Sequence, residues 1–129
     1  MGRFVLRGAL GLLLASPFPA EGQETAEVDP VTVSPERFTV LLENDHVRVV
    51  EYVLLPGERD EWHTHPPKVS YVVAGGTLRI TTGDGQSFVT EELTGAAAWM
   101  EELGLHFAQN VGATPVRIVL IEVKGARAP

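Results

Sequence analysis

The sequence predicts a single all-β domain, folded as a sandwich or barrel. Short runs rich in β-branched and aromatic residues recur along the chain, and turn signals separate them at roughly regular spacing. No stretch of comparable strength has helical periodicity. With 129 residues, the chain suits one ordinary domain and is too short for two. Eight such strands favour a jelly roll, the eight-stranded double-sheet architecture.

The predicted domain spans residues 38–124. Glycine-containing turns such as Pro56-Gly57 and Gly75-Gly76 end the runs, because glycine and proline favour tight turns over continued strands. The last run is followed by a short C-terminal tail, 125–129. The expected strands are residues 38–42, 46–55, 69–74, 77–82, 87–93, 97–100, 106–110 and 116–123.

The first 22 residues are predicted to be a cleavable secretory signal. Arg3 and Arg7 accompany an apolar run, and Ala20 and Gly22 supply small residues before a cleavage site. A disordered tail is the alternative. The apolar run is shorter than the ~20 residues of a membrane-spanning helix, so no stable membrane association is expected. Residues 23–37 are polar and are expected to form an arm or linker. These features predict a secreted or periplasmic protein.

The composition limits the partners of the mature chain. The full chain has a formal net charge of −7, and without residues 1–22 it has 8 Lys and Arg against 16 Asp and Glu, a net charge of −8. This acidic character argues against nucleic acid and anionic membranes as partners, because their phosphate groups are themselves anionic. The chain has no cysteine, so no disulfide stabilises the small fold. A short chain buries a modest core, and a subunit interface is a common source of added stability. A homodimer is therefore expected.

Three histidines predict a metal site. His63 and His65 are two residues apart, and in a strand such residues point to the same face. His106 begins another expected strand, and three imidazoles suit Zn, Cu, Fe or Ni. A His-x-His pair can also be an exposed polar face, but its position between a Pro-Gly turn and Pro66-Pro67 favours the metal site. His46 lies beside an aspartate at a strand start and is expected to be solvated.

The spacing of these residues resembles the two motifs of the cupin family. In the first motif a glycine is followed, after five residues, by His-x-His. The second motif contains a glycine, a histidine and an asparagine. The matching residues are Gly57, His63 and His65 in the first motif, and Gly95, His106 and Asn110 in the second.

The resemblance covers residues 44–124 and is closest to small stand-alone cupins that include the β-alanine-degradation type. It implies a cupin jelly-roll β-barrel, usually dimeric, with one transition-metal ion per subunit inside the barrel. It does not specify a reaction, because the same barrel is found in dioxygenases, isomerases, decarboxylases and proteins without activity.

Two departures from the family pattern concern the fourth metal ligand. The family's glutamate, five residues after the second histidine, is Ser70 in this chain, and the Pro-x-Gly of the second motif is replaced by residues 101–103. Serine is a poor metal ligand. A three-histidine site with open positions for water, O2 or substrate is therefore the simplest inference.

Three further polar residues are candidates for catalysis. Glu101 or Glu102 precedes His106 and could bind a metal-bound water or orient an imidazole, although both also suit a solvated turn. Gln109 could donate a hydrogen bond to a bound oxygen species. Trp62 and Trp99 offer flat surfaces on which a sugar ring could stack, or they pack in the core or an interface.

Export favours copper as the metal, because Fe(II) oxidises readily outside the cytosol and copper binds nitrogen ligands tightly. Iron and zinc remain alternatives. A secreted copper cupin without the glutamate resembles the cellulose oxidative cleaving enzymes, which implies oxidation of cellulose or a related polysaccharide by O2 or peroxide, with an external electron donor. The competing hypotheses are a diketone- or ring-cleaving dioxygenase, which predicts a closed apolar pocket, and a non-catalytic periplasmic metal- or ligand-binding protein.

Overall fold

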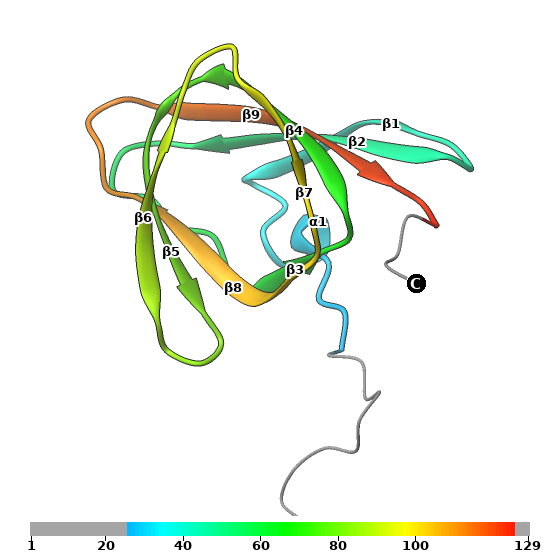
Figure 1. Cartoon of the computed structure of the whole chain (residues 1–129), viewed down its shortest axis with the longest axis horizontal. Helices are drawn as coiled ribbons and strands as arrows, with labels where there is room; N and C mark the ends of the chain where they lie inside the picture. The colour runs from blue at the N-terminus through cyan, green and yellow to red at the C-terminus, as the bar shows by residue number, and fades with distance from the viewer. Residues whose placement is uncertain (1–25, 126–129) are drawn as a thin grey trace, which may run out of the picture.

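Two antiparallel sheets face each other in the computed structural model, which describes residues 26–125 (Figure 1). The predicted signal segment 1–22, residues 23–25 and most of the predicted tail lie outside the described residues. Within that part of the chain there is one short helix, and no helix is long and apolar enough to cross a membrane.

The larger sheet has five strands in the order β1-β2-β9-β4-β7, and the smaller has four in the order β3-β8-β5-β6. The larger sheet contains β1 (Phe38–Glu43), β2 (Val47–Leu54), β9 (Val116–Val123), β4 (Lys68–Ala74) and β7 (Ala97–Met100). The smaller sheet contains β3 (His63–His65), β8 (Leu103–Asn110), β5 (Gly76–Thr82) and β6 (Ser87–Glu92).

The prediction of an all-β jelly-roll domain is confirmed, and each of the eight expected strands is present, with ends that agree with the expected ones or differ by at most three residues. The additional strand is β3, a three-residue segment too short for sequence periodicity to reveal.

The predicted arm contains a helix that was not expected. This helix, α1 (Pro30–Val33), packs against β1 and β3. Asp29 caps it by accepting a hydrogen bond from the backbone N–H of Val31, and proline at its first position suits a helix start.

The core lies between the two sheets because alternate residues of each strand point inward. Strand β9 alternates buried and less buried residues along its whole length, with Val116, Ile118 and Leu120 facing the interior. Phe38 and Tyr52 stack there with ring centroids 4.5 Å apart. Towards one end of the barrel the inward-facing residues become polar. They include three histidines, Lys68 and Glu122.

Candidate metal centre

Three imidazoles meet inside the barrel. His63 and His65 lie on β3, and His106 pairs with His63 across the ladder from β8. The centroid of the His63 ring lies 4.4 Å from the centroid of the His106 ring and 4.6 Å from that of the His65 ring. One nitrogen of each ring lies within 4.8 Å of the others, and the residues are only 1%, 8% and 5% exposed. The structure thus brings together the three histidines predicted as metal ligands.

Backbone carbonyls orient two of the rings. Nδ1 of His63 lies 2.6 Å from the carbonyl oxygen of Glu61, and Nδ1 of His106 lies 2.7 Å from that of Gly104. A carbonyl oxygen can only accept, so each Nδ1 carries the hydrogen and each Nε2 keeps a lone pair. Carbonyl partners of this kind are typical of metal-binding histidines.

The third ring is positioned differently from the other two, because no backbone carbonyl of residues 26–125 accepts from its Nδ1. Nε2 of His65 lies 3.0 Å from Nε2 of His63, while its Nδ1 is buried and has no hydrogen-bond partner among the described residues. The imidazole is therefore held in place by packing and by its neighbour. Convergent neutral nitrogens suit a borderline transition metal, so these residues fit one bound ion of Zn, Cu, Fe or Ni.

Burial keeps the imidazoles neutral near pH 7. Burial lowers the pKa of His63, lowers that of His65 further, and brings that of His106 to about 4. The positive charge of Lys68 lowers all three pKa values as well. A neutral imidazole is the form that binds metal.

A cavity of about 160 Å³ adjoins the three rings. Its inner wall is apolar, and its rim includes Phe88 on β6 and Met100 on β7, which are 50% and 41% exposed. These strands end the two sheets, so the cavity opens between the sheet edges. The buried apolar wall consists of Phe38, Leu78, Ala108, Ile118 and Leu120.

Asp60 and Tyr52 also line the cavity, and sequence reasoning missed both. Asp60 accepts hydrogen bonds from the Tyr52 hydroxyl at 2.7 Å and from the backbone N–H of Ala108 at 2.8 Å. One of its oxygens lies 3.7 Å from Nδ1 of His63. Burial raises the pKa of Asp60, although these hydrogen bonds act in the opposite direction. Asp60 is therefore hydrogen-bonded to β8 and lies next to the His63 ring, so it helps to fix one relative to the other.

Lys68 is a second residue that the sequence analysis missed. It faces inward from β4 and lines the cavity together with Ser70. Burial lowers the pKa of Lys68 to about 8, against the attraction of Glu122. Its positive charge lowers the pKa of all three imidazoles. Ser70, which the comparison with the cupin motif emphasised, has no such effect on them.

The predicted catalytic candidates do not join the three imidazoles. Glu101 is exposed and accepts a 2.8 Å hydrogen bond from the Trp99 indole. Glu102 is exposed and lines a separate outer groove, which His65 also borders. Gln109 lies three residues after His106 on β8, so it points to the opposite face of the sheet. The position of these side chains gives no support to a direct role at the metal.

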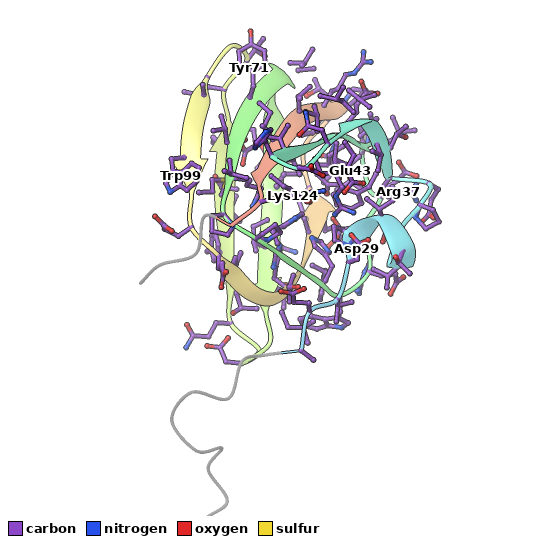
Figure 2. The ribbon with its side chains drawn as sticks, turned by 90° about the vertical axis from the view of Figure 1, so that its right-hand side faces the viewer. Asp29, Arg37, Glu43, Tyr71, Trp99 and Lys124 are labelled. Carbon is purple, nitrogen blue, oxygen red and sulfur yellow. The ribbon has the colours of Figure 1, made fainter. Side chains whose placement is uncertain are left out.

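The two tryptophans lie outside the cavity. Trp62 packs edge-on against Phe107, with ring centroids 4.7 Å apart. Trp99 is on β7 and points away from the barrel, as does Tyr71 on β4 (Figure 2). Asn110, from the second motif, has a structural role. Its buried amide donates to the carbonyl oxygens of Leu54 and Thr114.

Comparison with known proteins supports the fold assignment. No family model and no curated protein sequence matches the chain. A cupin domain from Bordetella pertussis Tohama I is 29% identical, with a TM-score of 0.63 over 68% of this chain and 92% of that one. An uncharacterised conserved protein with a double-stranded β-helix domain, from Klebsiella pneumoniae, is 23% identical, with a TM-score of 0.54 over 86% of this chain and 85% of that one.

A third solved structure agrees with these two. An RmlC-like cupin family protein from Methanocaldococcus jannaschii is 15% identical and has a TM-score of 0.53, covering 86% of this chain and 92% of that one. At this identity the likeness concerns the fold alone. The chain described here therefore has the double-stranded β-helix fold of small cupin proteins, with three buried histidines that can hold one metal ion.

Proposed function

We propose that this protein is a mononuclear metal-dependent oxygenase that acts on a small molecule inside the barrel. His63, His65 and His106 are the metal ligands. The observation that carries the proposal is the direct contact between these buried ligands and an apolar cavity. A cavity of about 150 Å³ accommodates a molecule the size of benzene, so a single ring or a short diketone fits the available space.

The chemistry divides between the ion and the chain. When bound, a redox-active metal supplies Lewis-acid and redox chemistry at the positions that three protein ligands leave open. The chain contributes neutral donors oriented by Glu61 and Gly104, while the apolar wall binds the body of the substrate and excludes water. Copper is our preferred metal, on the argument that the protein is exported. Export itself is a proposal, since segment 1–22 lies outside the described residues.

Oxidative cleavage of cellulose, the first hypothesis from the sequence, is less well supported. A polymer chain needs an ion that is reachable from the surface, whereas the three imidazoles are buried, the cavity that all three line is of single-ring size, and the outer groove is bordered by His65 alone among them. The two tryptophans proposed to stack on sugar do not line that cavity. The small-molecule dioxygenase predicted a closed apolar pocket; the largely apolar lining of the cavity supports this hypothesis, although the cavity opens between the sheet edges.

We also propose that the protein is a homodimer. Strand β1 is an edge of the larger sheet and exposes Val40, Leu41 and Leu42. An edge strand with exposed apolar side chains is a typical site of pairing with another chain. Light scattering after size exclusion checks this: a monomeric mass contradicts the dimer, and a Leu41→Lys, Leu42→Lys variant should shift a dimer towards monomer.

The function is tested by metal content and oxygen consumption. The purified protein should bind one Cu(II) per chain and consume O2 with 2,4-pentanedione or catechol. His63→Ala, His65→Ala and His106→Ala should each lose tight metal binding and activity. His46→Ala is the matched control, because His46 is exposed and lies outside the site. Metal binding without O2 consumption on any small substrate contradicts the oxygenase, and oxidised oligosaccharides from cellulose with a reductant favour the polysaccharide hypothesis.

A further inference from the structure

A buried lysine lies in the wall of the metal cavity. Lys68 is 4% exposed and belongs to a row of inward-facing residues that crosses the larger sheet. In this row Arg48 on β2 is paired with Glu122 on β9, Glu122 with Lys68 on β4, and Lys68 with Met100 on β7. Of the two basic residues in this row, Arg48 and Lys68, only Lys68 lines the cavity.

The carboxylate beside Lys68 is already engaged elsewhere. Both oxygens of Glu122 accept hydrogen bonds from Arg48, each at 2.9 Å, and Arg48 also binds Asp29 at 2.8 Å. Among residues 26–125, Lys68 makes no hydrogen bond or ion pair through its ammonium group. An ammonium group has three donors, and because the described residues use none of them, they are available to a ligand in the cavity.

The other acidic side chains that line the cavity do not pair with the ammonium group of Lys68. Asp60 is hydrogen-bonded to Tyr52 and to the backbone of Ala108, and Glu92 accepts from Thr90 near the rim. A divalent ion on three neutral imidazoles adds two further positive charges to the same space. Ion and ammonium repel each other unless an anion lies between them.

We propose that Lys68 is an anion receptor, and that the natural substrate of the cavity is a small organic acid whose carboxylate binds its ammonium group. This inference rests on the proposed small-molecule function and narrows its substrate class. The body of the substrate is apolar and of single-ring size, because the cavity is small and much of its remaining lining is apolar, including Phe38, Leu78 and Ile118. Lys68 is then a specificity-determining residue.

Titration calorimetry with benzoate and its neutral analogue benzamide tests the proposal. Acetate and phenylacetate extend the series to smaller and larger acids. The full chain is used in two forms, metal-free and loaded with Zn²⁺, which is redox-inert. Lys68→Met removes the charge with little change of shape, and Lys68→Arg retains it. The matched control is Lys124→Met, since Lys124 is the other lysine of the chain and pairs with Glu43 at the surface.

The wild type and Lys124→Met should bind benzoate more tightly than benzamide. Lys68→Met should bind benzoate roughly 10- to 100-fold more weakly, the effect of losing a hydrogen bond to a charged group, with benzamide binding unchanged. Lys68→Arg should retain a preference for the acid. Benzoate should also raise the affinity for Zn²⁺ in the wild type and not in Lys68→Met, because the coupling of two ligands is reciprocal.

Three results overturn the proposal: no binding of any of the three acids, equal binding of benzoate and benzamide by the wild type, or undiminished benzoate binding by Lys68→Met. The metal function fails separately. Lys68-dependent benzoate binding by a protein that takes up no metal supports the anion receptor and contradicts the oxygenase. Stoichiometric metal binding by a protein whose benzoate binding does not depend on Lys68 contradicts the anion receptor and leaves the proposed metal site standing.

Discussion

The hydroxyl of Tyr52 donates a 2.7 Å hydrogen bond to Asp60, whose other carboxylate oxygen lies 3.7 Å from Nδ1 of His63. Both side chains are buried, and Asp60 also receives the backbone N–H of Ala108 on the opposite sheet. The pair therefore links a strand of the larger sheet to the strand that carries His106. A hydrogen bond at this position contributes to the stability of the fold and to the placement of the metal ligands.

Tyr52→Phe should destabilise the protein by about 1–3 kcal/mol, because one oxygen of Asp60 loses its donor in a buried environment. Urea unfolding of the metal-free protein measures this change. Tyr71→Phe is the control, since Tyr71 is exposed and its loss of a hydroxyl should change stability little. Equal stability of the two variants contradicts a structural role for the Tyr52–Asp60 bond.

The stability of the metal-free protein should decrease as the pH falls below about 6.5. Burial lowers the pKa of the three site histidines, to about 4 for His106, so the unfolded chain binds more protons than the folded one between these values. The histidines contribute their full stabilising free energy above their pKa in the unfolded chain, and this contribution is lost as the pH falls towards their pKa in the folded protein. His106→Gln removes one titrating group and should show a shallower dependence. Parallel curves for the two proteins contradict this explanation.

Gly75→Ala should destabilise the fold by roughly 1–3 kcal/mol, the cost of forcing backbone apart in a packed region. A Cβ at Gly75 would lie 2.0 Å from the backbone oxygen of Glu92, at the end of β6. Gly83→Ala is the control, because the nearest atom to its Cβ would lie at an ordinary 3.4 Å. Thermal melting of both variants provides the comparison, and equal melting temperatures contradict the close approach.

Gln109→Ala, Glu101→Gln and Glu102→Gln should bind one metal ion with wild-type affinity. Gln109 faces away from the site, and the two carboxylates lie outside the cavity. Metal titration of each variant measures this, with His106→Ala as the positive control for loss. A large decrease for any of the three restores that residue as a participant at the metal.

The strand pattern and the shared face of His63 and His65 were predictable from the sequence because they depend on local spacing, whereas His106 was identified as a third imidazole and by its match to the second cupin motif. His63 and His65 are two apart, and alternation alone places them on one face. The same parity argument, applied to Gln109 and His106, indicates opposite faces and could have excluded Gln109. What parity cannot supply is the absolute face, so the outward position of Glu102 required the structure.

Lys68 and Asp60 were missed for a different reason. Asp60 belongs to a run of charged residues, 58–61, that has the composition of a solvated turn, and Lys68 follows two prolines. Charged residues are rarely buried without a partner, so the default expectation for both is the surface. Their burial follows from long-range pairing, of β4 with β9 and of Asp60 with Ala108, which no local pattern contains.

The N-terminal arm covers the edge of the strand that carries two of the three candidate metal ligands. Strand β3 ends the smaller sheet, and the backbone N–H of Thr64 donates to the carbonyl oxygen of Val28 at 2.8 Å, as a further strand would. Ser34 binds the backbone of Glu61, and Asp29, beside α1 in Figure 2, binds Arg48. Residues 26–34 thus hold β3 and the residues before it in place from the side opposite β8. A tag, protease or binding partner that displaces this segment would leave β3 held by β8 alone and would expose the edge of the strand that carries His63 and His65.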